Sequence, residues 1–135
     1  MPDARPNPAP VPHRGVLAIG LLGGLLAVIL AALAAHGPLA PTDVTGQRQI
    51  DTANLLHFVH VLGLMLLAFW PGPFPWRLAT AACWIAGTLL FSGSLYALVL
   101  FGQAWPGLVT PLGGLLLMLG WLAWLTGIIR AKKAP

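Results

Sequence analysis

The chain has 135 residues, of which 58% are hydrophobic and only 7% are charged, whereas an ordinary soluble domain carries about 25% charged residues. From Leu78 to Ile129 there is no charged residue at all, and a chain this small has too much surface to keep such a stretch away from water. The composition therefore excludes a separate soluble domain and predicts a membrane protein.

The net charge of +4 does not indicate a nucleic-acid-binding protein. The basic residues stand at the ends of apolar stretches and not in a patch, so membrane topology explains them better. Cys83 is the only cysteine, which excludes an intramolecular disulfide and a cysteine-rich metal site.

Four apolar stretches without charged residues are each long enough to cross the hydrocarbon core as a helix, which satisfies its own backbone hydrogen bonds. These predicted spans are Gly15–Ala35, Thr52–Trp70, Leu78–Phe101 and Leu108–Ile129. Proline and glycine separate them, at Gly37-Pro38, Pro71-Gly72-Pro73 and Pro106-Gly107. The predicted fold class is all-α, an integral membrane four-helix bundle over residues 15–130.

The segment before the first span, residues 1–14, is rich in proline and predicts a disordered or extended tail. Residues 131–135 form a short basic tail at the other end. Arg14, the apolar run and Ala32-Leu33-Ala34 also fit a cleaved secretory signal peptide. The apolar run exceeds the roughly 7–15 residues of a signal core, which favours an uncleaved span.

The distribution of Lys and Arg predicts the orientation of the chain. With four spans, the N-terminal tail, the second loop and the C-terminus share one side of the membrane. That side holds Arg5, Arg14, Arg77, Arg130, Lys132 and Lys133. The other side holds only Arg48. By the positive-inside rule we expect both termini in the cytoplasm and the protein in the bacterial inner membrane.

Glycines at helical spacing predict places where helices approach closely. Gly20 and Gly24 form such a pair on the first span, and Gly113 and Gly120 lie on the last. Small residues let helix backbones come together in lipid, where packing replaces the hydrophobic effect. Packing within one bundle is the favoured interpretation, and a dimer interface is the alternative.

Polar side chains of all four spans are expected in the outer half of the bundle. They are His36, Asn54, His57, His60, Ser92, Ser94, Tyr96 and Thr110. An unpaired polar group in hydrocarbon costs several kcal/mol, so these side chains should point inward and bond to one another.

Three interpretations of this polar cluster remain open. In the structural one, His60 bonds to Ser92 or Tyr96 and locks the packing. In the redox one, His36, His57 or His60 ligates a haem or a metal. In the third, the histidines form a pathway for protons or a small solute. The structural interpretation is favoured, with no cofactor and no metal. The deep histidines share one helix, no carboxylate or thiolate lies near them, and the cytoplasmic half is nearly all apolar.

No enzyme constellation is present in the sequence. There is no phosphate loop, no intramembrane carboxylate and no nucleophile with a suitable base, and Ser92-Gly93-Ser94 lies within a helix without a strained turn. We expect a non-enzymatic accessory or interaction subunit that contacts the lipid bilayer and a membrane-protein partner or a second copy. A carrier, channel or redox-cofactor protein is the alternative.

At several of these residues the chain resembles a known family. The segment Leu90–Tyr96, with Ser92-Gly93-Ser94 at its centre, and the segment Thr110–Gly114 resemble the signature of the bacterial family called domain of unknown function 423. Ala35-His36-Gly37 is similar to that family's alanine-histidine-glycine motif. The family is similar to the eukaryotic transmembrane protein 256. This resemblance implies a small membrane protein with four helices and no established activity.

Overall fold

The computed structural model describes residues 11–37, 40–102, 107 and 109–131. They form four helices, which are α1 (Arg14–His36), α2 (Val44–Phe69), α3 (Phe74–Phe101) and α4 (Val109–Ala131). Each is long and apolar enough to cross a membrane, so the predicted all-α membrane fold is confirmed. Of the two predicted tails, residues 1–10 and 132–135 lie outside the described residues.

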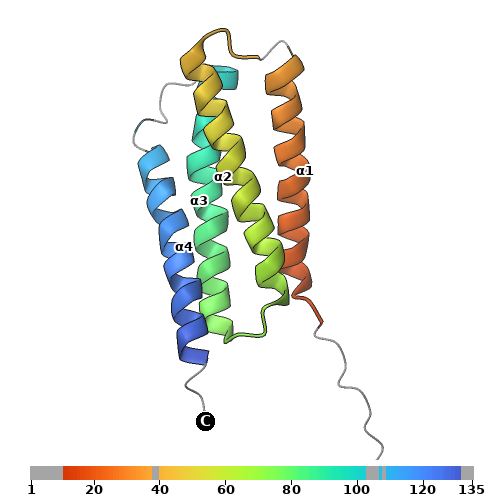
Figure 1. The fold of residues 1–135 in the computed structure, drawn as a ribbon, viewed down its shortest axis with the longest axis vertical. Coiled ribbons are helices and arrows are strands. Elements are labelled where there is room, and N and C mark those ends of the chain that lie inside the picture. The colour runs from red at the N-terminus through yellow and green to blue at the C-terminus, as the bar shows by residue number, and fades with distance from the viewer. Residues whose placement is uncertain (1–10, 38–39, 103–106, 108, 132–135) are drawn as a thin grey trace, which may run out of the picture.

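The helices run alternately up and down (Figure 1). The beginning of α1 and the end of α4 lie at one end of the bundle, which we call the terminal end, and the beginning of α2 and the end of α3 lie at the opposite, distal end. The main contacts follow chain order, because α1 packs mainly on α2, α2 on α3, and α3 on α4. The pair α2 and α3 therefore forms the middle of the bundle.

Two helices begin earlier than the predicted spans. Helix α2 begins at Val44 and not at Thr52, because the Asp43 side chain caps it and accepts a hydrogen bond from the Gly46 N–H at 2.8 Å. Helix α3 begins at Phe74, ahead of the predicted start at Leu78, with a proline in its first turn, where a missing N–H costs little. Absence of charge marks where a helix meets hydrocarbon, whereas a cap marks where the helix begins.

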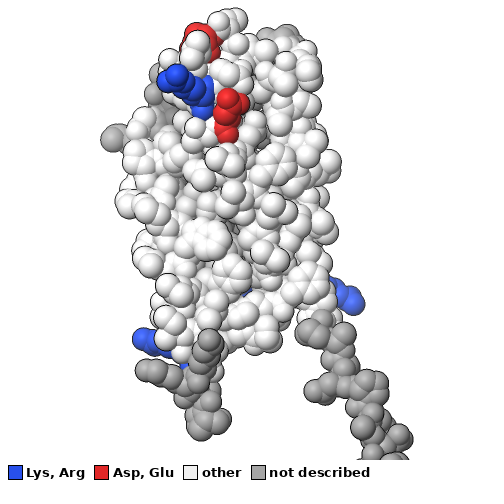
Figure 2. All heavy atoms as spheres, viewed as in Figure 1, with Lys and Arg blue, Asp and Glu red and all other residues white. Residues whose placement is uncertain are grey.

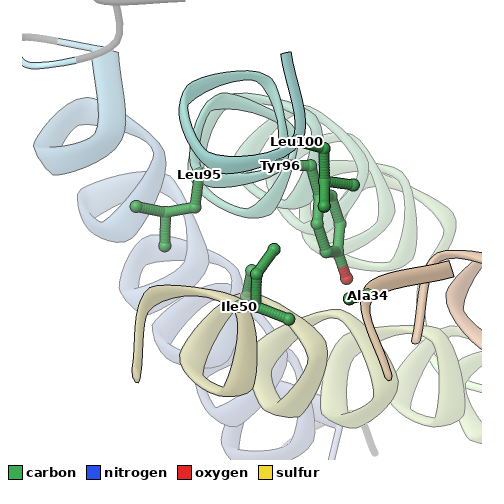
Figure 3. Close-up of a cluster of buried hydrophobic side chains, with 6 residues drawn as sticks. Ala34, Ile50, Leu95, Tyr96 and Leu100 are labelled. Carbon is green, nitrogen blue, oxygen red and sulfur yellow. The ribbon is translucent and has the colours of Figure 1, made fainter. Parts of the chain in front are cut away.

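The core consists of two groups of buried side chains at different depths. The distal group comprises Ala34, Ile50, Ala53, Leu95, Tyr96 and Leu100 (Figure 3). The second group lies nearer the terminal end and comprises Leu64, Leu67, Ala81, Trp84 and Leu117. Trp84 is fully buried, and its ring centroid lies 4.7 Å from that of Trp121 and 5.4 Å from that of Trp124.

Glycines allow the close approach of α3 and α4. A Cβ on Gly113 would lie 2.8 Å from the Leu90 carbonyl carbon, and one on Gly87 would lie 2.9 Å from the Leu117 nitrogen. A Cβ on Gly120 would lie 2.5 Å from Nε1 of Trp84. Backbone or a rigid ring therefore occupies the space that any side chain at these positions would need.

Of the two glycines on α1, Gly20 is buried against α2, whereas Gly24 is only half-buried. A Cβ on Gly20 would lie 2.9 Å from Cγ of Met65, whereas one on Gly24 would meet only Cε of Met65, at 3.6 Å. Gly20, Gly113 and Gly120 thus pack against neighbouring helices of the same chain, and Gly24 is only loosely covered. Close packing within one bundle accounts for three of the four predicted packing glycines.

Candidate functional site: the buried polar side chains

Two separate groups of hydrogen bonds join the distal parts of α2 and α3, one around Tyr96 and one at Ser92. The Tyr96 hydroxyl donates to Oδ1 of Asn54 at 2.8 Å, and the Tyr96 hydroxyl oxygen lies 3.3 Å from Nδ1 of His57. A hydroxyl has a single proton, which here goes to Asn54, so the oxygen is left to accept from the Nδ1–H of His57. Ser92 donates to the Ala53 carbonyl at 2.9 Å. These bonds tie the middle two helices together.

His60 belongs to a different group of side chains. Its Nδ1 lies 2.7 Å from the Leu56 carbonyl oxygen, and its Nε2 lies 3.1 Å from Nε1 of Trp121. A carbonyl can only accept and an indole N–H can only donate, so Nδ1 carries the proton and Nε2 accepts. Both nitrogens of a neutral imidazole are therefore occupied.

The predicted partners of His60 were wrong. Ser92 and Tyr96 bond instead to Ala53 and Asn54, and the indole of Trp121 takes their place. The early start of α2 at Val44 explains the difference, because it places His60 farther along the helix than a start at Thr52 implies. At that depth His60 lies edge-on to the rings of Trp84 and Trp121.

The remaining predicted polar residues lie apart from these two groups. Ser94 and Thr110 join α3 to α4 through a hydroxyl–hydroxyl contact of 2.6 Å, and Ser94 also donates to the Phe91 carbonyl at 2.8 Å. His36 is exposed at the distal end of α1. The structure therefore brings together Asn54, His57 and Tyr96, but it does not unite all eight predicted residues in one cluster.

Sequence reasoning missed the central position of Trp84. This side chain is fully buried, and its indole Nε1 has no hydrogen-bond partner among the described residues, like the hydroxyls of Thr80 and Thr88. The three residues recur every four positions on one face of α3. The available signal was glycine on the neighbouring helices, because Gly63 and Gly120 leave the room that the indole fills.

The described residues contain neither a cluster of metal-ligating side chains nor a serine hydroxyl bonded to a histidine. Within residues 11–37, 40–102, 107 and 109–131, no group of three or more His, Cys, Asp or Glu side chains could hold a metal ion. The hydroxyls of Ser92 and Ser94 donate to backbone carbonyls, and neither is bonded to a histidine. What the arrangement does supply is hydrogen bonds between helices, each from a group that would be costly to leave unpaired in hydrocarbon.

Comparisons with known proteins give a consistent result. A family model described as a protein of unknown function (DUF423) matches residues 30–114. A UPF0382 membrane protein of Haemophilus influenzae is 35% identical over 120 residues, which cover 87% of this chain and 95% of that protein. The UPF0382 membrane protein YwdK of Bacillus subtilis is 36% identical over 107 residues, which cover 77% of this chain and 87% of that protein.

The inner membrane protein YgdD of Escherichia coli K12, also named UPF0382, is 32% identical over 128 residues, covering 89% of this chain and 93% of that protein. No solved structure matches the chain.

Proposed function

The chain belongs to the DUF423 family of membrane proteins of unknown function, and from this premise we propose that it is a non-enzymatic accessory protein of the bacterial inner membrane. It acts by binding another integral membrane protein, and α1 is the helix that makes this contact.

The observation that supports a non-enzymatic role is the way the buried polar side chains use their hydrogen bonds. Both ring nitrogens of His60 are occupied, the Tyr96 hydroxyl meets Asn54 and His57, and Ser92 bonds to a carbonyl. A catalytic or ligand-binding group must instead be free to meet a substrate or a metal. Polar side chains whose hydrogen bonds are taken up by one another stabilise the packing of the helices.

The exposure of α1 supports a role in binding a partner. Only Gly20, Ala27 and Ala34 of this helix are buried, and its main contact is with α2 alone. The other helices bury a larger share of their apolar stretches. A helix attached on one side has its remaining faces open to lipid or to the helices of a second protein, and the loosely covered Gly24 leaves room for such a helix to approach.

Photo-cross-linking in the native membrane tests this proposal. A benzophenone amino acid replaces Leu25 of α1, which is 60% exposed, or Leu122 of α4, which is 57% exposed and serves as the matched control. We expect the α1 probe to form an adduct of one defined mass that contains another membrane protein. The added substitution Gly24→Leu should abolish that adduct without lowering the melting temperature.

Equal labelling from α1 and α4, or adducts with lipid alone, would contradict a partner on α1. Mass spectrometry of gently purified protein identifies whatever is bound.

A second candidate function is passage of protons or of a small solute. One observation favours it, namely that Nε2 of His57 faces α1 near Gly23 and has no hydrogen bond among the described residues. Flux through protein-containing liposomes that is lost in His57→Ala and kept in His36→Ala would support passage over accessory binding.

A further inference from the structure

A hollow of about 340 Å³ lies at the distal end of the bundle, on the side where α2 and α4 flank α3. Its α2 side is polar and consists of Thr45, Arg48, Gln49 and Thr52. Its floor is apolar, formed by Phe91 and Leu95 of α3. Thr110 of α4 completes the lining. The volume is in the range of small-ligand sites, and the hollow has both polar and apolar walls.

The four polar residues of the hollow lie on one face of α2, because positions 45, 48, 49 and 52 follow the i, i+3, i+4, i+7 spacing of a helix. This part of α2 precedes the predicted span. It therefore stands where hydrocarbon gives way to the polar surface of the bilayer. A ligand in the hollow would meet water-like surroundings at one end and lipid at the other.

Arg48 supplies a positive charge that no carboxylate of the described residues pairs with. Asp43 accepts from the Gly46 N–H, and Asp51 accepts from the Gln47 side chain. Arg48 is the only Lys or Arg from Gly15 to Trp76, and Figure 2 shows basic atoms next to acidic ones at the distal end. The Arg48 guanidinium is free to bind an anion.

We propose that this hollow binds the head group of an anionic phospholipid. Arg48 pairs with the phosphate, for which the fork of guanidinium N–H donors is well suited, and the Thr45 and Thr52 side chains flank it. Phe91 and Leu95 contact the first carbons of the acyl chains. A zwitterionic head group would bring an ammonium toward Arg48, whereas an anionic one does not. This inference does not depend on a protein partner at α1.

Native mass spectrometry of the full chain in detergent tests this site. The protein is mixed with equal amounts of phosphatidylglycerol and phosphatidylcholine, and we expect one phosphatidylglycerol to stay bound. Arg48→Gln should weaken its retention about tenfold, as expected for the loss of a charge-assisted hydrogen bond. Arg48→Lys, which keeps the charge but loses the fork, should give an intermediate loss.

Arg130→Gln is the matched control, because it removes one exposed positive charge from the terminal end. Equal loss in Arg130→Gln and Arg48→Gln, or equal retention of phosphatidylcholine, would overturn the proposal. Inorganic phosphate is the second probe, and displacement of the lipid by millimolar phosphate would instead indicate a site for a soluble anion. Melting temperatures measured without added lipid show whether each variant is folded, and Thr45→Val provides a second variant of the hollow.

Discussion

The close packing of α3 against α4 predicts opposite outcomes for two adjacent glycines. A Cβ added at Gly113 would lie 2.8 Å from the carbonyl carbon of Leu90, which is backbone and cannot rotate away. A Cβ added at Gly114 would lie 3.5 Å from Cδ2 of Phe91, an ordinary van der Waals contact. Gly113→Ala and Gly114→Ala therefore form a matched pair on one turn of one helix.

The expected magnitudes follow from two opposing effects. Overpacking a close contact costs about 1–3 kcal/mol, and an obstacle made of backbone places Gly113→Ala toward the upper end of that range. Replacing a helical glycine with alanine stabilises by roughly 0.5–1 kcal/mol in both variants. We expect Gly113→Ala to lose about 2 kcal/mol of unfolding free energy and Gly114→Ala to be neutral or slightly stabilised.

The assay is equilibrium unfolding of the purified protein in micelles by a denaturing detergent, followed by tryptophan fluorescence. Its signal comes from rings that lie on both helices, such as Trp84 and Trp121. Equal midpoints for the two variants would refute the packing of Gly113 against α3. A change of oligomeric state in Gly113→Ala alone would restore the dimer interpretation of this glycine.

Three further outcomes are expected. Trp121→Phe removes the donor to His60 and should cost about 1 kcal/mol, whereas Trp124→Phe, whose indole N–H has no partner among the described residues, should cost less in the same unfolding assay. Tyr96→Phe should destabilise by about 1 kcal/mol, and the loss should shrink in a background that already carries Asn54→Leu, as a double-mutant cycle would show. Reporter fusions at each end should both read cytoplasmic, as the distribution of basic residues predicts, and reporters on opposite sides would contradict it.

The sequence predicted those features of the fold that depend on composition. Absence of charge located four membrane-length helices, and the proline and glycine breaks fell between them. The beginnings of α2 and α3 were not predicted, because a charged turn such as the one around Arg48 continues a helix beyond the hydrocarbon. A capping residue like Asp43 signals such a beginning, whereas hydropathy does not.

The candidate site was predicted in part. Asn54, His57 and Tyr96 were expected to share one depth, and they meet. The partner of His60 was not predicted, because depth along α2 was counted from Thr52 and the helix begins at Val44. His60 was therefore expected beside the wrong residues of α3. Trp84 was missed because, in the sequence, a buried tryptophan of an apolar helix looks the same as one that faces lipid. Only the glycines on α2 and α4 indicate that this tryptophan is buried.

The three tryptophan rings that meet near the terminal end of the bundle predict a feature of the circular dichroism spectrum. The ring centroids of Trp84 and Trp121 lie 4.7 Å apart with the ring planes tilted by 58°, and the Trp124 ring is close to both. Transition dipoles at such separations couple strongly. The ultraviolet circular dichroism of the protein should therefore carry a split exciton band. The size of that splitting depends on the angle between α3 and α4. It would therefore report this angle in any lipid without an attached label.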